Sequence, residues 1–213
     1  MCQYFDSGHT SQRVFVLHGL GGSGKSQIAF KFLEDSQANK WYDLAKHIKN
    51  NVWVIYGYIN FRFSDFFYID ATNQQTLEAD LMTIAPTHIE KSVGACQRWL
   101  ASLHGQNWLL FFDNADDVQL DLAAFFPACR FGNILVTTRN PHLCIHAGQD
   151  GDAKVIGMDP EDAKHLLLSM SRSEKKDENE KLAELIVKVL FIICFFVKYS
   201  QTNRGHRSSI ILH

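Results

Sequence analysis

Several features that mark other protein classes are absent from this sequence. Its 213 residues include five cysteines, which are scattered and never spaced Cys-x-x-Cys. An odd number of scattered cysteines argues against a disulfide framework or a zinc knuckle and favours a reducing compartment. The opening stretch, residues 1–11, is polar and lacks the apolar segment of a secretory signal. We therefore expect a cytoplasmic protein.

Strong charge and long apolar runs are also lacking. The net charge of −2 provides no basic field that would attract nucleic acid. The apolar run Val189–Val197 is bounded by Lys188 and Lys198 and is too short to span a bilayer. We therefore expect neither a nucleic-acid partner nor a membrane anchor, and we interpret the run as a buried helix end or an exposed adhesive tail.

The sequence does contain a glycine-rich segment, Gly19–Ser26, which fits the phosphate-binding pattern G-x-x-x-x-G-K-[ST]. The apolar run Val14–Leu17 before it predicts a buried strand, and Gln27–Glu34 after it has apolar residues at helical spacing. A strand before the motif and a helix after it are the context that a phosphate-binding loop requires. This context favours such a loop over a glycine-rich turn without a ligand.

The residue types in this segment suit the binding of a nucleotide. Glycines let backbone N–H groups approach phosphate oxygens, and the N-terminus of the following helix faces the anion. Lys25 is placed to reach the β- and γ-phosphates, and Ser26 offers a hydroxyl group to Mg²⁺. The predicted nucleotide-binding residues are Gly19, Gly21, Gly22, Ser23, Gly24, Lys25, Ser26, Gln27 and Arg139.

Further strand and helix patterns alternate along the chain. Strands are expected at Phe66–Ile69, Trp108–Phe112, Asn133–Val136 and Lys154–Ile156. Helices are expected at Gln74–Ile84 (capped by Thr72 or Asn73), at Ile89–Leu103, at Leu120–Phe126, after Asp159 and after Asp177. This alternation predicts an α/β fold of the P-loop NTPase type, a parallel β-sheet with helices on both faces in three layers. Polar residues follow the strands at the edge where such sheets bind ligands.

Two of these strands end in residues that suit nucleotide chemistry. Leu109–Phe112 is followed by Asp113, which is the pattern of a Walker B strand. We expect Asp113 to hold Mg²⁺ opposite Ser26, although a helix-cap or turn aspartate is the alternative. Arg139 follows the next strand and is expected to contact a γ-phosphate, with a surface arginine as the alternative.

Four motifs together resemble a known family. They are GLGGSGKS at residues 19–26, LLFFDNADD at 109–117, ILVTTR at 134–139 and IGMDPEDAKHLLL at 156–168. In this order they resemble NB-ARC domains of the STAND-class signalling NTPases, in particular fungal NLR-like proteins, over roughly residues 13–36 and 61–187. The resemblance implies binding of ATP or ADP with Mg²⁺ and a switch between resting and homo-oligomerising states. It also implies an intracellular role in self/non-self recognition or programmed cell death.

The sequence departs from this family at the residue after Asp113. Many relatives carry a second acid there, which polarises the attacking water, whereas this chain has Asn114. An amide orients water but is a poor general base. Asp113 and Asn114 are the candidate catalytic residues, with Asp116 or Asp117 as substitute bases. We expect a weak ATPase at most, with slow or absent hydrolysis.

The domain organisation departs from the family as well. We expect a loose N-terminal stretch at residues 1–12, a P-loop domain at 13–171 with an insertion at 37–60, and a C-terminal helix with an atypical tail at 172–213. The helical domain, winged helix and sensor repeats of relatives do not follow. We hypothesise that the insertion and the tail from residue 189 are translated intron or a mis-set gene model, which a transcript spliced continuously through both would contradict.

Other functions are compatible with parts of this sequence. An active P-loop ATPase or small-molecule kinase stays open, although no arginine-rich lid is present, and a truncated fragment without function stays open too. A GTPase is disfavoured because no N-K-x-D motif occurs. The segment His142-x-Cys144-x-His146 carries metal-type ligands, but their alternate spacing is not a usual zinc pattern.

Overall fold

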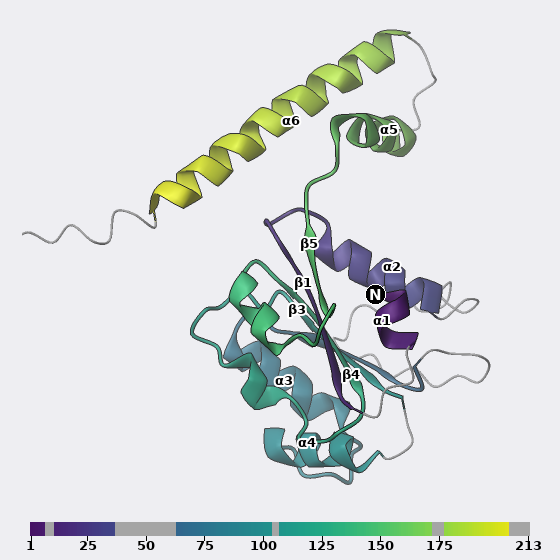
Figure 1. Cartoon of the computed structure of the whole chain (residues 1–213), viewed down its shortest axis with the longest axis vertical. Helices are drawn as coiled ribbons and strands as arrows, with labels where there is room; N and C mark the ends of the chain where they lie inside the picture. Colours follow the sequence, from purple (N-terminus) through teal and green to yellow (C-terminus); the bar gives the residue numbers. More distant parts are fainter. Residues whose placement is uncertain (7–10, 37–62, 104–106, 172–176, 205–213) are drawn as a thin grey trace, which may run out of the picture. The chain divides into compact units, whose positions relative to one another are not determined.

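The computed structural model describes residues 1–6, 11–36, 63–103, 107–171 and 177–204 (Figure 1). The chain divides into two compact units, Met1–Ile156 and Gly157–His213. The predicted insertion at 37–60 lies outside the described residues.

The first unit is built on a parallel sheet of five strands. They are β1 (Arg13–Gly19), β2 (Phe66–Asp70), β3 (Leu109–Asp113), β4 (Asn133–Thr138) and β5 (Asp152–Val155). Their order is β2-β3-β4-β1-β5, and each neighbouring pair is parallel. β3 and β4 are buried along their whole length, as expected of parallel strands that are covered on both faces. The predicted α/β fold is confirmed.

Helices and two 3₁₀ turns surround this sheet. They are α1 (Cys2–Asp6), α2 (Lys25–Ser36), α3 (Gln74–Ile84), α4 (Val93–Ser102), η3 (Leu122–Phe125) and η4 (Pro141–His146). Side chains alternate across β1, so Val14 and Val16 join a core cluster with α3 and α4, whereas Phe15 and Leu17 join a second cluster with α1 and α2. The two clusters cover opposite faces of the sheet, which gives the predicted three layers (Figure 1).

Local side-chain hydrogen bonds decide where two of these helices begin. Asn73, one of the two expected caps, accepts a hydrogen bond from the Thr76 N–H at 3.0 Å and starts α3. Ser92 accepts one from the Ala95 N–H at 3.3 Å, so α4 begins at Val93 rather than at the expected Ile89. The helix expected at Leu120–Phe126 is the four-residue 3₁₀ turn η3.

The N-terminal stretch differs from the sequence expectation. Residues 1–12 were expected to be loose, but residues 2–6 form α1, and Phe5 is only 2% exposed. Its ring lies 6.1 Å from Phe15, 5.7 Å from Phe32 and 5.6 Å from Phe63, measured between centroids. Burial of a large aromatic side chain lowers the free energy of the folded chain, which favours a buried position for Phe5 over an exposed one. This end of the chain is therefore part of the core.

The second unit contains α5 (Pro160–Ser171) and α6 (Asp177–Arg204). The start of α5 is as predicted, since Asp159 accepts hydrogen bonds from the Glu161 and Asp162 N–H groups at 3.0 Å each. The predicted boundary after residue 171 differs from the structure, in which the first unit ends at Ile156 and α5 groups with α6. α5 and α6 pack against one another, which accounts for this grouping.

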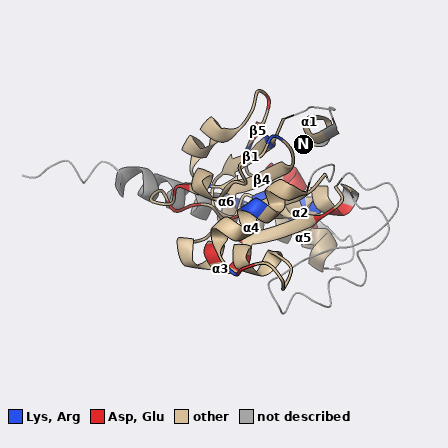
Figure 2. Cartoon of the chain, turned by 90° about the horizontal axis from the view of Figure 1, so that it is seen from below, with Lys and Arg blue, Asp and Glu red and all other residues tan. Residues whose placement is uncertain are grey.

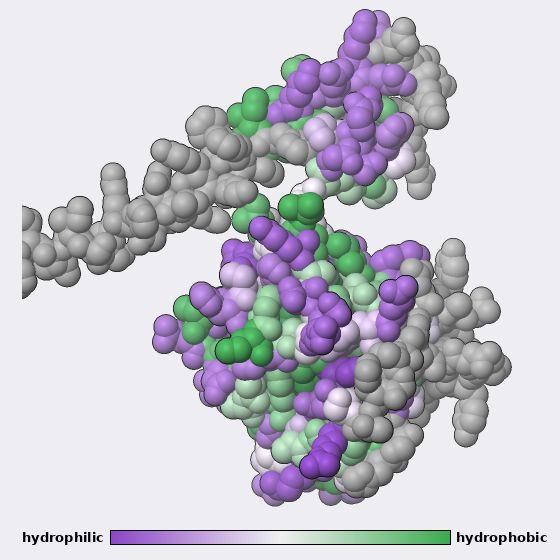
Figure 3. All heavy atoms as spheres, in the orientation of Figure 1, coloured by the Kyte–Doolittle hydropathy of each residue, from purple (hydrophilic) through white to green (hydrophobic). Residues whose placement is uncertain are grey.

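Apolar side chains remain exposed on α6. The side chains of Leu182, Leu185, Ile186, Val189 and Leu190 are 38–59% exposed, whereas Ala183 and Val187 are buried. Hydrophobic residues are accordingly visible on the surface of this unit (Figure 3). Within the described ranges, no helix has the length and apolar character needed to cross a membrane. Basic and acidic positions are interspersed along the elements (Figure 2), in keeping with the small net charge of −2.

Candidate functional site

The glycine-rich loop connects the end of β1 to the start of α2. β1 ends at Gly19 and α2 begins at Lys25, as the motif predicts. Gly22 and Gly24 have φ angles of +74° and +90°, a region that side-chain-bearing residues rarely adopt. Glycine at these two positions is therefore what allows the loop to turn into the helix.

Lys25 is folded into this loop. Its side chain is buried, and Nζ donates hydrogen bonds to the carbonyl oxygens of Gly19 at 3.0 Å and Leu20 at 2.8 Å. Burial lowers the pKa of the Lys25 ammonium, and the nearby Asp116 carboxylate partly offsets that shift. A cation inside the curve of the loop is placed to interact with an anion that binds there.

Ser26 and Asp113 meet although they are 87 residues apart in the chain. The Ser26 hydroxyl donates to Asp113 Oδ1 at 2.7 Å, and the Thr137 hydroxyl donates to the same oxygen. The Tyr68 hydroxyl donates to Oδ2 at 3.4 Å. Three hydroxyl groups thus hold one buried carboxylate. The pKa of Tyr68 is raised by burial and then by this carboxylate.

The Ser26–Asp113 pair has the chemistry of a magnesium site. Mg²⁺ prefers hard oxygen ligands at ~2.0–2.1 Å in octahedral geometry, which places neighbouring ligands about 2.9 Å apart. The hydroxyl and carboxylate oxygens here lie 2.7 Å apart. Their type and spacing therefore fit the ion that the sequence predicts.

Arg139 lies against the glycine-rich loop. A Cβ atom on Gly21 would lie 3.5 Å from Arg139 Cδ. Arg139 Nε pairs with Asp116 Oδ2 at 2.5 Å, and the Arg139 backbone N–H donates to Asp116 Oδ1 at the same distance. The predicted arginine therefore reaches the loop, but a neighbouring carboxylate holds it.

Asn114 occupies an unusual backbone conformation directly after β3. Its φ angle is +59°, which asparagine tolerates better than most residues. Its backbone N–H donates to Thr137 Oγ1 at 3.0 Å, so the exposed side chain is carried on a fixed backbone. The structure thus places this residue beside Asp113 at the sheet edge.

These groups surround a cavity of about 760 Å³, within the range of small-molecule sites. The residues that line it are Gly21, Gly22, Gly24, Lys25, Ser26, Gln27, Thr72, Asn114, Asp116, Asp117 and Arg139. The predicted residues Gly19, Ser23 and Asp113 are not in the lining. Ser23 Oγ is nevertheless buried without a hydrogen-bond partner in the described part of the chain, so it can still donate to a ligand.

Some residues of this site were not identified from the sequence. Tyr68 and Thr72 belong to none of the four motifs, and Thr137 lies within the ILVTTR motif but had no role assigned to it. Tyr68 reaches Asp113 because β2 pairs directly with β3, with Asp70 opposite Asp113. No sequence signal states which strands are neighbours, so this contact could be found only from the sheet order.

No protein-family model matches the sequence, and no curated protein matches it. Among solved structures, one that matches is the Signal Transduction ATPase with Numerous Domains (STAND) protein with a tetratricopeptide repeat sensor from Pyrococcus horikoshii. The identity is 17% and the TM-score is 0.41, over 87% of this chain and 27% of that one. The chain therefore spans about a quarter of that protein's length.

Proposed function

We propose that this chain binds an adenine nucleotide with Mg²⁺ and acts as an NB-ARC-like switch module of an intracellular signalling protein. The observation that best supports this is that Lys25, Ser26 and Arg139 line one cavity, and that Ser26 at its wall donates a hydrogen bond to Asp113. A loop lysine, a hydroxyl–carboxylate pair and a guanidinium are the groups that recognise a nucleoside polyphosphate and its metal ion.

Each group has a definite part in binding. Lys25 exchanges the Gly19 and Leu20 carbonyls for phosphate oxygens, and the loop amides face the same anion. Ser26 and Asp113 hold Mg²⁺, with Thr137 orienting the carboxylate. When bound, the ion neutralises phosphate charge. These residues account for binding of the nucleotide and do not require that it be hydrolysed.

The switch depends on which nucleotide is bound and for how long. Arg139 can leave Asp116 for a γ-phosphate, which only a triphosphate offers. Asn114 lacks the basicity of a carboxylate, so a bound triphosphate persists. A slow ATPase is the second candidate, since Asp117 also lines the cavity. The preference for adenine rests on the missing guanine-reading motif and on the family resemblance.

The wider role rests on the order of the four motifs. By that resemblance, the intact protein would be cytoplasmic, would homo-oligomerise in its active state and would serve self/non-self recognition or cell death. Its partner domains would be the helical and winged-helix domains and sensor repeats that relatives carry.

Thermal unfolding with Mg²⁺ and ADP, ATP or GTP tests the proposal. Binding to the folded state raises its stability by about 2.7 kcal/mol at a hundredfold excess of ligand over Kd. We expect adenine nucleotides to raise Tm and Lys25→Ala to abolish the shift. Lys31→Ala is the matched control, because Lys31 is an exposed lysine of the same helix that pairs with Glu34.

The outcomes separate the alternatives. A shift that Lys31→Ala keeps and Lys25→Ala loses supports the proposal. A cooperative transition that no nucleotide moves would favour the non-functional fragment instead. A larger shift with GTP than with ATP would contradict the adenine assignment.

A further inference from the structure

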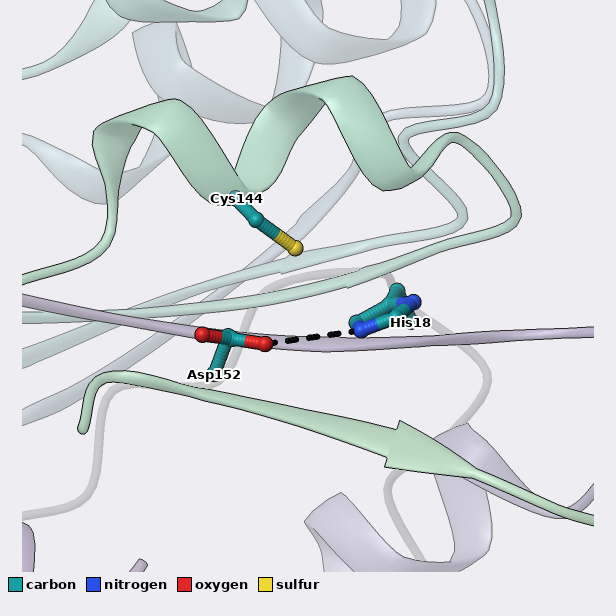
Figure 4. A group of neighbouring side chains, drawn as sticks. All are labelled: His18, Cys144 and Asp152. Atoms are coloured by element: carbon teal, nitrogen blue, oxygen red, sulfur yellow. Dashed lines mark ion pairs between the residues drawn. The ribbon is translucent and has the colours of Figure 1, made fainter.

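A second group of ligand-bearing side chains lies outside the nucleotide cavity. His18 is the second-last residue of β1, Cys144 belongs to η4 and Asp152 is the first residue of β5 (Figure 4). His18 Nε2 and Asp152 Oδ2 are 3.5 Å apart. One nitrogen, one sulfur and one carboxylate oxygen all lie within 4.8 Å of one another. None of these residues lines the cavity described above.

The sheet and η4 bring these three residues together. β5 pairs with β1 so that Asp152 is opposite Val16, and His18 is two residues further along the same face. Cys144 packs against the core cluster that contains Val14 and Val16. The Cys144 side chain points toward the pair formed by His18 and Asp152 (Figure 4). Three separate elements therefore present one ligand atom each to a common point.

The kind of atoms indicates the kind of ion. Imidazole nitrogen, thiolate sulfur and carboxylate oxygen are the ligands of tetrahedral zinc, and three of them leave a fourth position for water. Tetrahedral ligands at zinc distances are roughly 3.3–3.8 Å apart. The His18–Asp152 separation of 3.5 Å already meets this requirement. Cys144 Sγ lies within 4.8 Å of the other two ligand atoms.

The electrostatics disfavour a nucleophilic cysteine at this place. Burial raises the pKa of the Cys144 thiol, and the Asp152 carboxylate raises it further. Reactive thiolates are found where the pKa is lowered, so the grouping does not activate Cys144 for attack. A divalent cation between the sulfur and the carboxylate would instead stabilise both in their charged forms.

The grouping is open enough for an ion to enter. The His18 side chain is 15% exposed and that of Asp152 is 46% exposed. The neighbouring histidines do not take part, since His146 packs edge-on against Phe126 and His142 is exposed. The His-x-Cys-x-His segment thus contributes its cysteine alone, and the other two ligands come from strands.

We propose that His18, Cys144 and Asp152 form a binding site for one zinc-type transition-metal ion, with water as the fourth ligand. The site goes beyond the proposed nucleotide function and does not depend on it. An ion bound there would connect β1, which leads into the glycine loop, with η4, which follows Arg139.

Cobalt titration of the metal-stripped full chain tests this proposal. Co²⁺ is the probe because its visible bands report tetrahedral geometry and a near-ultraviolet charge-transfer band reports a thiolate ligand. We expect one equivalent to bind and to be displaced by Zn²⁺. Cys144→Ser should lose the charge-transfer band, and His18→Gln and Asp152→Asn should each weaken binding by at least about tenfold. Cys129→Ser, which removes another half-buried free thiol, should leave the spectrum unchanged.

The controls separate metal binding from folding and from nucleotide binding. Thermal unfolding without metal shows whether each variant is folded. If Cys144→Ser does not fold, the test rests on Asp152→Asn, because the Asp152 side chain is half-exposed and its replacement should not disturb folding. Lys25→Ala should bind Co²⁺ like the parent chain, even where it has lost nucleotide binding. Absence of saturable Co²⁺ and Zn²⁺ binding, or an unchanged charge-transfer band in Cys144→Ser, would overturn the proposal.

Discussion

Asp113 depends on hydroxyl groups from three other elements. Ser26 comes from α2, Tyr68 from β2 and Thr137 from β4. A buried carboxylate that accepts several hydrogen bonds keeps one orientation and stays ready for a cation. The motif identifies Ser26 and Asp113, but the orientation of the carboxylate comes from side chains outside the motif.

The residue after Asp113 limits the chemistry of the site. We expect Asn114→Asp to raise the rate of ATP hydrolysis at least about tenfold, because a carboxylate at this position supplies a general base. Aspartate also tolerates the left-handed φ of +59° found there. Single-turnover hydrolysis with Mg²⁺ measures the effect. Asn114→Gln is the control, and equal rates in both variants would mean that the water is activated elsewhere.

Under the proposed function, Arg139 is the residue that would distinguish ATP from ADP. Removal of a charge-assisted hydrogen bond costs about 1.5–3 kcal/mol. Arg139→Ala should therefore weaken ATP binding about tenfold or more and leave ADP binding nearly unchanged. Calorimetric titration of both nucleotides gives the comparison. An equal loss for ATP and ADP would show that Arg139 contacts the shared phosphates or supports the loop.

At the scale of elements, an aromatic cluster ties α1 to the sheet. Phe5 lies among Phe15, Phe32 and Phe63, and the Arg13 guanidinium stands 5.8 Å from its ring centroid. The helix is only five residues long and is too short to be stable by itself. Its formation is therefore a consequence of this packing.

Removal of the Phe5 side chain should destabilise the first unit. We expect Phe5→Ala to lower the free energy of unfolding by about 3–5 kcal/mol, the usual cost of removing a buried phenylalanine. Gln3→Ala, on the exposed side of the same helix, should change it by less than about 0.5 kcal/mol. Denaturant unfolding measures both. A small effect of Phe5→Ala would mean that α1 contributes little to the core.

At the scale of the whole molecule, the two units differ in how much apolar surface they bury. β3 and β4 are buried throughout, whereas α5 has no buried residue and, among the α6 side chains that the structure describes, Ala183 and Val187 are buried. Segments with few buried apolar contacts open at low free energy. Among the described residues, the exposed apolar side chains of α6 would be stabilised by a covering partner.

Hydrogen exchange should reveal this difference directly. We expect amides of α5 and α6 to exchange at least about tenfold faster than those of β3 and β4, because local opening of the helices exposes little additional apolar surface. Mass spectrometry of peptides from both units measures the rates, with β1 peptides as an internal control. Equal protection in both units would show that α5 and α6 unfold only with the sheet.

The sequence by itself determined the features that are local in the chain. The loop from Gly19 to Ser26, the strand ending in Asp113 and the start of α5 each follow from neighbouring residues whose spacing sets the backbone. The parallel α/β fold follows as well, because buried strands alternating with helices have few other arrangements.

Only the tertiary structure decided which distant residues meet. The order β2-β3-β4-β1-β5 brings Tyr68 to Asp113, and η4 brings Cys144 to His18 and Asp152. Burial of Phe5 and the grouping of α5 with α6 likewise depend on surfaces formed after folding. Such contacts depend on the packing free energy of the whole core. This free energy cannot be read from any short stretch of the sequence.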